Sequence, residues 1–203
     1  MVSRLYKSCE SISRLALLMG GIMVGFSVLL VTIEVISRKV FSTSVIGSDE
    51  ISGYILACAT AWGLSYALYR RRHIRVDAVY VHLPAAVQRT LDIIALVALG
   101  SFFSILAYQA VFVFAESWRI GAESNTTLRI PLWIPQFIWM LGLVFFVFNI
   151  FVILCEVLMA LFRRDFALMK SIAAAPSIRE EIDDEIGETN APAEKARAEG
   201  AAA

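Results

Sequence analysis

The sequence predicts an all-α, polytopic membrane protein with four transmembrane helices. Its 203 residues are 59% hydrophobic, whereas a soluble domain is usually about 45–50% apolar. The apolar residues are gathered into four runs without a charged side chain, at residues 15–33, 51–69, 93–115 and 130–155. Each run approaches or exceeds the roughly 20 residues that a helix needs to cross a hydrocarbon layer about 30 Å thick.

The first run has one alternative interpretation, a signal peptide, because Arg4, Lys7 and Arg14 precede it. A signal peptide has an apolar core of roughly 7–15 residues, followed by a cleavage site of small residues. Here the apolar core is longer and no such site follows it. We therefore expect a retained transmembrane helix.

Small residues at helical spacing in the first two runs predict close helix packing. Membrane helices associate where small residues let their backbones approach, because lipid supplies no hydrophobic drive between them. The first run holds one GxxxG pair, and the second run has a small residue at every fourth position. The residues expected at helix contacts are Gly21, Gly25, Gly53, Ala57, Ala61 and Ser65. This pattern predicts that the second helix is packed centrally.

Charged residues surround the first connection. Glu34 lies four residues before Arg38, a spacing that supports an ion pair along one helix. Asp49 and Glu50 open the second helix, where negative charge is favourable at a helix N-terminus. We expect this connection to be short and exposed at the membrane surface.

The connection between the second and third runs, residues 70–89, contains five arginines and an apolar stripe. Val76, Val79 and Leu83 recur at helical spacing, which predicts a short amphipathic helix in the membrane interface with its basic flank toward anionic lipid. A plain linker with chance periodicity is the alternative. Pro84 is expected to end this segment and begin the third transmembrane helix.

The basic residues predict the orientation of the chain. Eleven Lys and Arg residues lie near the span ends on the side that holds both termini, against four on the other side. Because Lys and Arg are enriched in cytoplasmic loops, we expect both termini and the 70–89 connection in the cytoplasm. Asp77 is expected to cap a helix start in this turn. The residues singled out in the cytoplasmic turn are Arg70, Arg71, Arg72, His73, Arg75 and Asp77.

The third and fourth runs contain few polar side chains. Gln109 and Asn149 are the strongest of them, and we expect both to form hydrogen bonds between helices. The fourth run carries Phe and Trp on almost every side. Such a bulky helix is expected to face lipid or another protein rather than the middle of a tight bundle.

No motif predicts catalysis, a cofactor or a metal site. The only histidines, His73 and His82, lie in the 70–89 connection, whereas a b-type haem needs histidines inside its helices. Three cysteines have no disulfide or metal-ligand spacing, so we expect Cys9, Cys58 and Cys155 to be small buried hydrophobes. A net charge of zero gives no indication of a nucleic-acid partner.

The chain divides into three parts by composition. Residues 1–14 form a basic N-terminal segment, and residues 15–170 form the transmembrane domain. Residues 171–203 are acidic and then rich in alanine. This last part has too few large apolar side chains to fold alone, which predicts a mostly disordered cytoplasmic tail.

Several motif residues occur in a defined order before, within and after the second run. Arg38 and Phe41 are followed by Glu50 at the start of the second helix and by Gly63 inside it. A basic turn then leads into a His-Ile-x-Val-Asp motif, and a proline-bearing segment opens the fourth helix. The motif is written here as His73, Ile74, Val76 and Asp77, and the segment as Leu128 to Phe145. Over roughly Leu15 to Phe162, the chain resembles the small, DctQ-like permease subunit of tripartite ATP-independent periplasmic (TRAP) transporters.

This resemblance implies a non-catalytic subunit of the bacterial inner membrane that braces a large permease. The large permease would carry the sodium and substrate sites, and a soluble periplasmic protein would deliver the substrate, typically an organic acid such as a carboxylate. The resemblance implies no cofactor. The connections on the outer side would then form a periplasmic docking face, or else carry only solvated charges. Its candidate residues are Arg38, Asp49, Glu50, Arg119, Glu123 and Arg129.

Two other functions stay open at this point. The chain is also compatible with a membrane anchor or assembly subunit of another complex, such as a redox enzyme. A small homo-oligomeric channel or exporter is the third possibility, and the absence of charged residues within the four runs argues against it.

Overall fold

The computed structural model describes residues 2–42, 47–70, 83–126 and 128–163, and four long helices account for most of them. All four helices are long and apolar enough to cross a membrane, and the described residues contain no strand. The all-α class, with four helices able to span a membrane, is therefore confirmed for the described residues. The expected amphipathic segment around residues 71–82 and the tail at 171–203 lie outside the described residues. The helices are α1 (Val2–Phe41), α2 (Ser48–Tyr69), α4 (Ala85–Ile120) and α5 (Trp133–Phe162).

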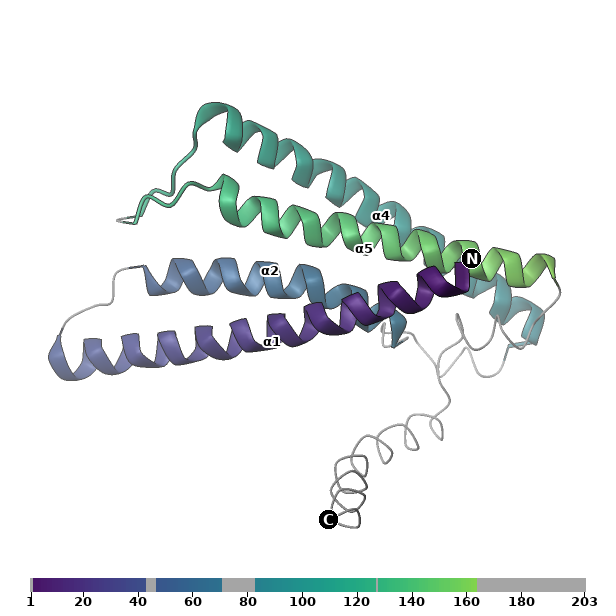
Figure 1. Cartoon of the computed structure of the whole chain (residues 1–203), viewed down its shortest axis with the longest axis horizontal. Helices are drawn as coiled ribbons and strands as arrows, with labels where there is room; N and C mark the ends of the chain where they lie inside the picture. Colours follow the sequence, from purple (N-terminus) through teal and green to yellow (C-terminus); the bar gives the residue numbers. More distant parts are fainter. Residues whose placement is uncertain (1, 43–46, 71–82, 127, 164–203) are drawn as a thin grey trace, which may run out of the picture.

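The helices form two antiparallel hairpins, α1 with α2 and α4 with α5 (Figure 1). The hairpins meet mainly where α2 packs against α5, and α1 also contacts α5. The connections α1–α2 and α4–α5 both lie at one end of the molecule, which we name the hairpin end. The N-terminus of α1 and the last turns of α5 lie at the other end, which we name the terminal end.

Proline and glycine set the limits of α4. The carbonyl of Pro84 accepts hydrogen bonds from the N–H groups of Val87 at 2.9 Å and Gln88 at 3.1 Å, so the predicted start at Pro84 is confirmed. The helix ends at Gly121, which has a φ of 63°. The N–H of Ala122 reaches back to the carbonyl of Ser117 at 2.9 Å. This is a Schellman ending, which favours glycine at the left-handed position.

The core is built around α5, so the prediction that the aromatic fourth helix is peripheral is wrong. Phe146, Ile150 and Val157 on this helix are at most 2% exposed. The ring of Phe146 meets Phe103 of α4 edge-on, with centroids 4.6 Å apart. Small residues on the neighbouring helices leave room for these large side chains. Those that pack in the buried region are Ala61 and Ser65 of α2 and Gly100, Ala107 and Ala110 of α4.

Gly20, next to the predicted GxxxG pair, lies at a close approach between α1 and α2. A Cβ placed on Gly20 would lie 3.4 Å from both Cα and Cβ of Ala59, so the two backbones nearly touch there. By contrast, a Cβ on Gly21 or Gly25 would have no neighbour within 4 Å. The GxxxG pair therefore makes no close helix contact among the described residues, and its packing role stays a prediction.

The row of small residues along α2 is buried only in its second half. Gly53 and Ala57 are exposed, whereas Ala61 is 2% exposed and Ser65 is fully buried. Positions four residues apart drift by about 40° around a helix with 3.6 residues per turn. Four such positions therefore cannot all face one neighbour, and the packing role of Gly53 and Ala57 stays a prediction.

Candidate functional site

The hairpin end carries all six residues predicted for a docking face. They come from the last turns of α1 and α4, the first turn of α2 and the α4–α5 connection. Five are exposed, and Glu50 is the one that is partly buried. In order along the chain they are Arg38, Asp49, Glu50, Arg119, Glu123 and Arg129.

Both helix-end arginines of this set are already paired with acids on their own helices. Arg38 donates from Nε to Oε1 of Glu34 at 3.1 Å, which confirms the predicted pair, and Glu34 is only 2% exposed. Arg119 donates two parallel hydrogen bonds to the carboxylate of Glu116, at 3.0 and 2.8 Å. The Arg119–Glu116 pair is exposed on both sides and so contributes little to stability, but both pairs fix where the guanidinium points.

Glu50 joins the two hairpins. One carboxylate oxygen accepts a hydrogen bond from the hydroxyl of Tyr54, one turn along α2, at 2.6 Å. The other accepts from the hydroxyl of Thr126 in the α4–α5 connection. The carboxylate therefore links the start of α2 to a loop that is 76 residues away in sequence.

The α4–α5 connection is an ordered turn rather than an open loop. Its two sides are held by backbone hydrogen bonds of 2.9 Å, from Ser124 to the carbonyl of Ile130 and from Leu132 to the carbonyl of Ala122. The side-chain oxygens of Ser124 and Thr126 lie 3.0 Å apart. The tip of the connection therefore presents its hydroxyls in a fixed arrangement toward α2.

A second contact at the hairpin end involves Gly47, the residue before α2. Gly47 has a φ of 85°, a left-handed conformation that favours glycine. A Cβ there would lie 1.9 Å from Cδ1 of Leu128. Leu128 thus occupies the space that any other residue would need, and the connection sits directly on the start of α2.

Polar side chains also meet deep between the hairpins. Tyr69 donates to the amide oxygen of Asn149 at 2.7 Å, and the Asn149 amide donates to the hydroxyl of Ser65 at 3.2 Å. Asn149 and Ser65 are fully buried. The interhelical hydrogen bond predicted for Asn149 is confirmed, whereas Gln109 is exposed on α4.

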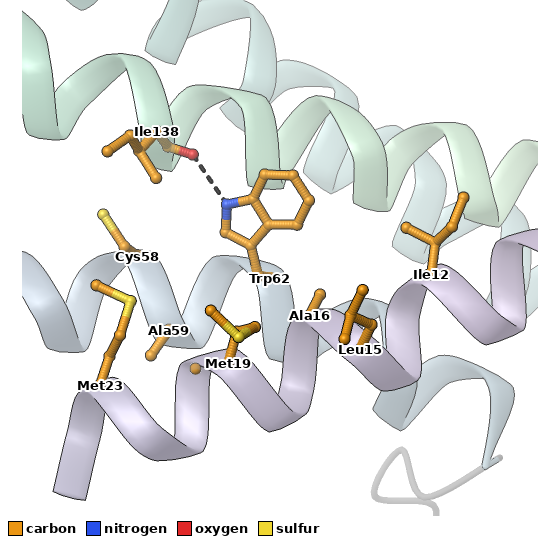
Figure 2. Close-up of a pocket in the computed structure, with 10 residues that line it drawn as sticks. Ile12, Leu15, Ala16, Met19, Met23, Cys58, Ala59, Trp62 and Ile138 are labelled. Carbon is orange, nitrogen blue, oxygen red and sulfur yellow. Dashed lines mark hydrogen bonds between the residues drawn. The ribbon is translucent and has the colours of Figure 1, made fainter.

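An apolar groove lies between α1, α2 and α5 near the middle of α2 (Figure 2). It has a volume of about 310 Å³. The indole of Trp62 points across toward α5 and donates to the carbonyl of Ile138 at 3.1 Å. With its one polar wall group already bonded, the groove suits hydrocarbon rather than a charged solute. Its lining is Ile12, Leu15, Ala16, Met19, Gly20, Met23, Cys58, Ala59, Trp62 and Ile138.

The terminal end holds one feature that the sequence did not indicate. Glu156 of α5 is 9% exposed, and its Oε1 has no hydrogen-bond partner among the described residues. In the turn after α2, Arg70 donates to the hydroxyl of Tyr66 at 2.8 Å and lies 5.5 Å from the centre of that ring. The other turn residues, Arg71, Arg72, His73, Arg75 and Asp77, lie outside the described residues.

The chemistry of the described residues is that of contact surfaces. No group of three or more His, Cys, Asp or Glu side chains among them could hold a metal ion. Cys9 and Cys58 are buried and Cys155 is half-buried, and all three thiols are free. What the arrangement offers is a polar hairpin end and long apolar lateral faces.

Sequence reasoning missed the residues that organise the hairpin end. Tyr54 stands four residues after Glu50, a spacing from which their hydrogen bond was predictable. Nothing in the sequence indicated the contacts of Thr126 and Leu128, because their partners are in another hairpin. The same holds for Tyr69 as the partner of Asn149.

Comparison with known proteins identifies the family. A family profile described as the DctQ component of tripartite ATP-independent periplasmic transporters matches residues 27–160. No curated protein and no solved structure matches the chain. The profile covers the C-terminal part of α1, the whole of α2 and α4, and nearly all of α5. The chain therefore belongs to the DctQ family, the small membrane component of TRAP transporters.

Proposed function

We propose that this chain is a non-catalytic small subunit that braces the large permease of a sodium-coupled, binding-protein-dependent transporter for organic acids such as carboxylates. Family membership supports the assignment to a TRAP transporter. Sodium coupling and the substrate class follow from the resemblance to that family. The bracing role rests on how the four helices expose their apolar surface.

The observation that carries the bracing role is the apolar surface of α1. Six large apolar residues spread along this helix are each more than half exposed, at 57–63%. In a membrane such a surface faces lipid or the helices of another subunit. Gly21 and Gly25 lie on α1 with open space beside them, so a partner helix can approach closely there. The six apolar residues are Leu15, Leu18, Ile22, Phe26, Leu29 and Ile33.

We further propose an orientation in the inner membrane, with the hairpin end in the periplasm and both termini in the cytoplasm. The excess of Lys and Arg near the terminal end supports this orientation. The hairpin end would then face the periplasmic substrate-binding protein. The arginine-rich turn after α2 would face anionic lipid headgroups on the cytoplasmic side.

The subunit role is tested by isolating the tagged chain from its native membrane in mild detergent and identifying what accompanies it by mass spectrometry. We expect a large polytopic permease in near-equal amount. A redox enzyme in its place would support the anchor function, and a chain that emerges only with itself would exclude the subunit role. A tagged, unrelated membrane protein of similar abundance is the control.

The orientation is tested by labelling single added cysteines with a membrane-impermeant maleimide in a strain whose outer membrane has been made permeable. Asn125 and Arg163 are exposed at opposite ends of the described structure. We expect Asn125→Cys to react in such cells and Arg163→Cys to react only after the inner membrane is opened. The unmodified chain, whose three cysteines are buried or half-buried, gives the background. The reverse labelling pattern would contradict the proposed orientation.

A further inference from the structure

We propose that Glu50 is a positioning residue: it holds the α4–α5 connection in the conformation that the substrate-binding protein recognises, rather than contacting that protein itself. This inference rests on the proposed function, in which the hairpin end faces the binding protein. It assigns different roles to residues that the sequence places in one group.

The first reason is that the carboxylate of Glu50 is already engaged. Each of its two oxygens accepts a hydrogen bond from within the chain, one from Tyr54 and one from Thr126. Hydrogen bonds to a charged acceptor are roughly twice as strong as neutral ones. A docking protein would have to displace one of them to bind this carboxylate directly.

The second reason is the position of Thr126 within the connection. Its N–H donates to the hydroxyl oxygen of Ser124 at 3.3 Å, and its own hydroxyl lies 3.0 Å from the same atom. The carbonyl of Thr126 accepts the N–H of Arg129 at 3.2 Å. By binding the Thr126 hydroxyl, Glu50 therefore attaches the whole tip of the connection to the start of α2.

The third reason is the kind of contact that Leu128, at the same tip, makes with the start of α2. Leu128 fills the space beside Gly47, but an apolar contact of this kind does not fix the rotation of the tip. The hydrogen bond from Thr126 to Glu50 is directional and fixes how the tip is rotated about that apolar contact. Both contacts together hold the turn in one orientation.

The consequence concerns the two charges carried by the connection. Glu123 and Arg129 are exposed, and within the described part of the chain neither forms an ion pair. By contrast, Arg38 and Arg119 are paired on their own helices. Glu123 and Arg129 are therefore charges that the connection makes available to a partner, and Glu50 determines where they point.

The experiment uses the complex of the small and large subunits in lipid nanodiscs and the transporter's own purified substrate-binding protein, labelled with a fluorophore. Its affinity for the complex is measured with Glu50→Ala, Glu50→Gln and Thr126→Val. Hydrogen–deuterium exchange of the peptide covering residues 121–132 is followed in the same samples. This second readout reports the order of the connection without reference to docking.

We expect Glu50→Ala to weaken binding about tenfold, the equivalent of one lost charge-assisted hydrogen bond, and to speed exchange in residues 121–132. Thr126→Val should have the same two effects. The double variant Glu50→Ala, Thr126→Val should bind little more weakly than either single variant, since both substitutions remove the hydrogen bond between Thr126 and Glu50. Glu50→Gln keeps a carbonyl acceptor and should restore most of the affinity.

Each other outcome has a definite meaning. Weaker binding with unchanged exchange would show that Glu50 contacts the binding protein directly, and unchanged binding would show that it has no role in docking; either result overturns the inference. If Glu50→Ala prevents assembly, Thr126→Val decides between the same outcomes. Failure of the unmodified complex to bind the protein would instead refute the proposed function.

Discussion

Tyr69 of α2 donates a 2.7 Å hydrogen bond to the side-chain oxygen of Asn149 in α5, and the two residues lie in the region where the hairpins meet. The Asn149 amide group continues to the hydroxyl of Ser65. Buried polar groups in a membrane protein need such partners, because no water is present to replace them. This relationship, three close contacts and one buried acid lead to five predictions.

The first prediction concerns this polar contact. Asn149→Leu leaves the hydroxyls of Tyr69 and Ser65 without that partner, and we expect a loss of about 1–3 kcal/mol in the free energy of unfolding. Combined with Tyr69→Phe in a double-mutant cycle, it should show a coupling of about 0.6–1.7 kcal/mol, the range found for hydrogen bonds between membrane helices. Unfolding is followed by circular dichroism in mixed micelles with increasing SDS. Strictly additive effects would show that the contact contributes nothing.

The second prediction compares two adjacent glycines in α1. Gly20→Ile places a branched side chain against the backbone of Ala59 and should destabilise the isolated chain by about 1–3 kcal/mol. Gly21→Ile faces open space and should change stability by less than about 0.5 kcal/mol. The two variants add the same atoms to the same helix, so each is the control for the other. Equal losses would contradict the described α1–α2 contact.

The third prediction concerns Gly142 and Trp62. A Cβ on Gly142 would lie 2.9 Å from Cδ1 of Trp62, so Gly142→Ala should push the indole away from its acceptor on Ile138. We expect a loss of about 1–3 kcal/mol. Gly63→Ala is the matched control, because its Cβ would meet only Leu17, at an ordinary 3.6 Å. That variant should be neutral or gain up to about 1 kcal/mol from helix propensity, and the melting temperatures of the two variants give the comparison.

The fourth prediction separates two effects at Gly47. Gly47→Ala combines a left-handed backbone, which costs roughly 1–2 kcal/mol for other residues, with a collision against Leu128. Adding Leu128→Ala removes the collision but leaves the backbone strain. The double variant should therefore be more stable than Gly47→Ala and less stable than Leu128→Ala alone. A double variant that is no better than Gly47→Ala would mean that Leu128 does not fill this space.

The fifth prediction concerns the unpartnered acid of α5. Glu156 is 9% exposed, and its Oε1 lacks a hydrogen bond among the described residues. A buried polar group without a partner costs about 1–3 kcal/mol, so Glu156→Met should raise the melting temperature of the purified chain in detergent. Glu10→Met, at an exposed acid on α1, is the control and should change little. A lower melting temperature for Glu156→Met would show that this carboxylate has a stabilising partner.

Most of the fold was predictable because the number of helices depends on the apolar bilayer more than on contacts between particular residues. Four apolar runs of sufficient length predict four helices in any bilayer, and Pro84 marked a helix start that the structure confirms. The uncharged runs nevertheless underestimated the length of the helices. α4 begins eight residues before its run and buries Asp92 within its first turns, since a helix continues until its backbone is capped.

Helix contacts were predicted less well, because a pattern on one helix does not say what lies beside it. The small residues of α2 predicted a central helix, and α2 does pack between α1 and α5. The sequence did not indicate that α5 shares the centre, where buried small residues accommodate its aromatic side chains. Similarly, Gly20 and Gly21 are indistinguishable in sequence. Only the crossing of α1 over α2 decides which of them makes contact.

For the candidate docking residues too, the sequence predicts the location, whereas the tertiary structure decides the contacts. Charge and topology alone predict that six residues lie at one end of the molecule. The pairing of Arg38 and Arg119, the engagement of Glu50 and the availability of Glu123 and Arg129 depend on distances within and between hairpins. Hydropathy, charge and spacing act along the chain and so determined the helices, the expected orientation and the family resemblance. The central helix, the packing glycine and the role of Glu50 were decided by the tertiary structure, because each depends on atoms that are far apart in sequence.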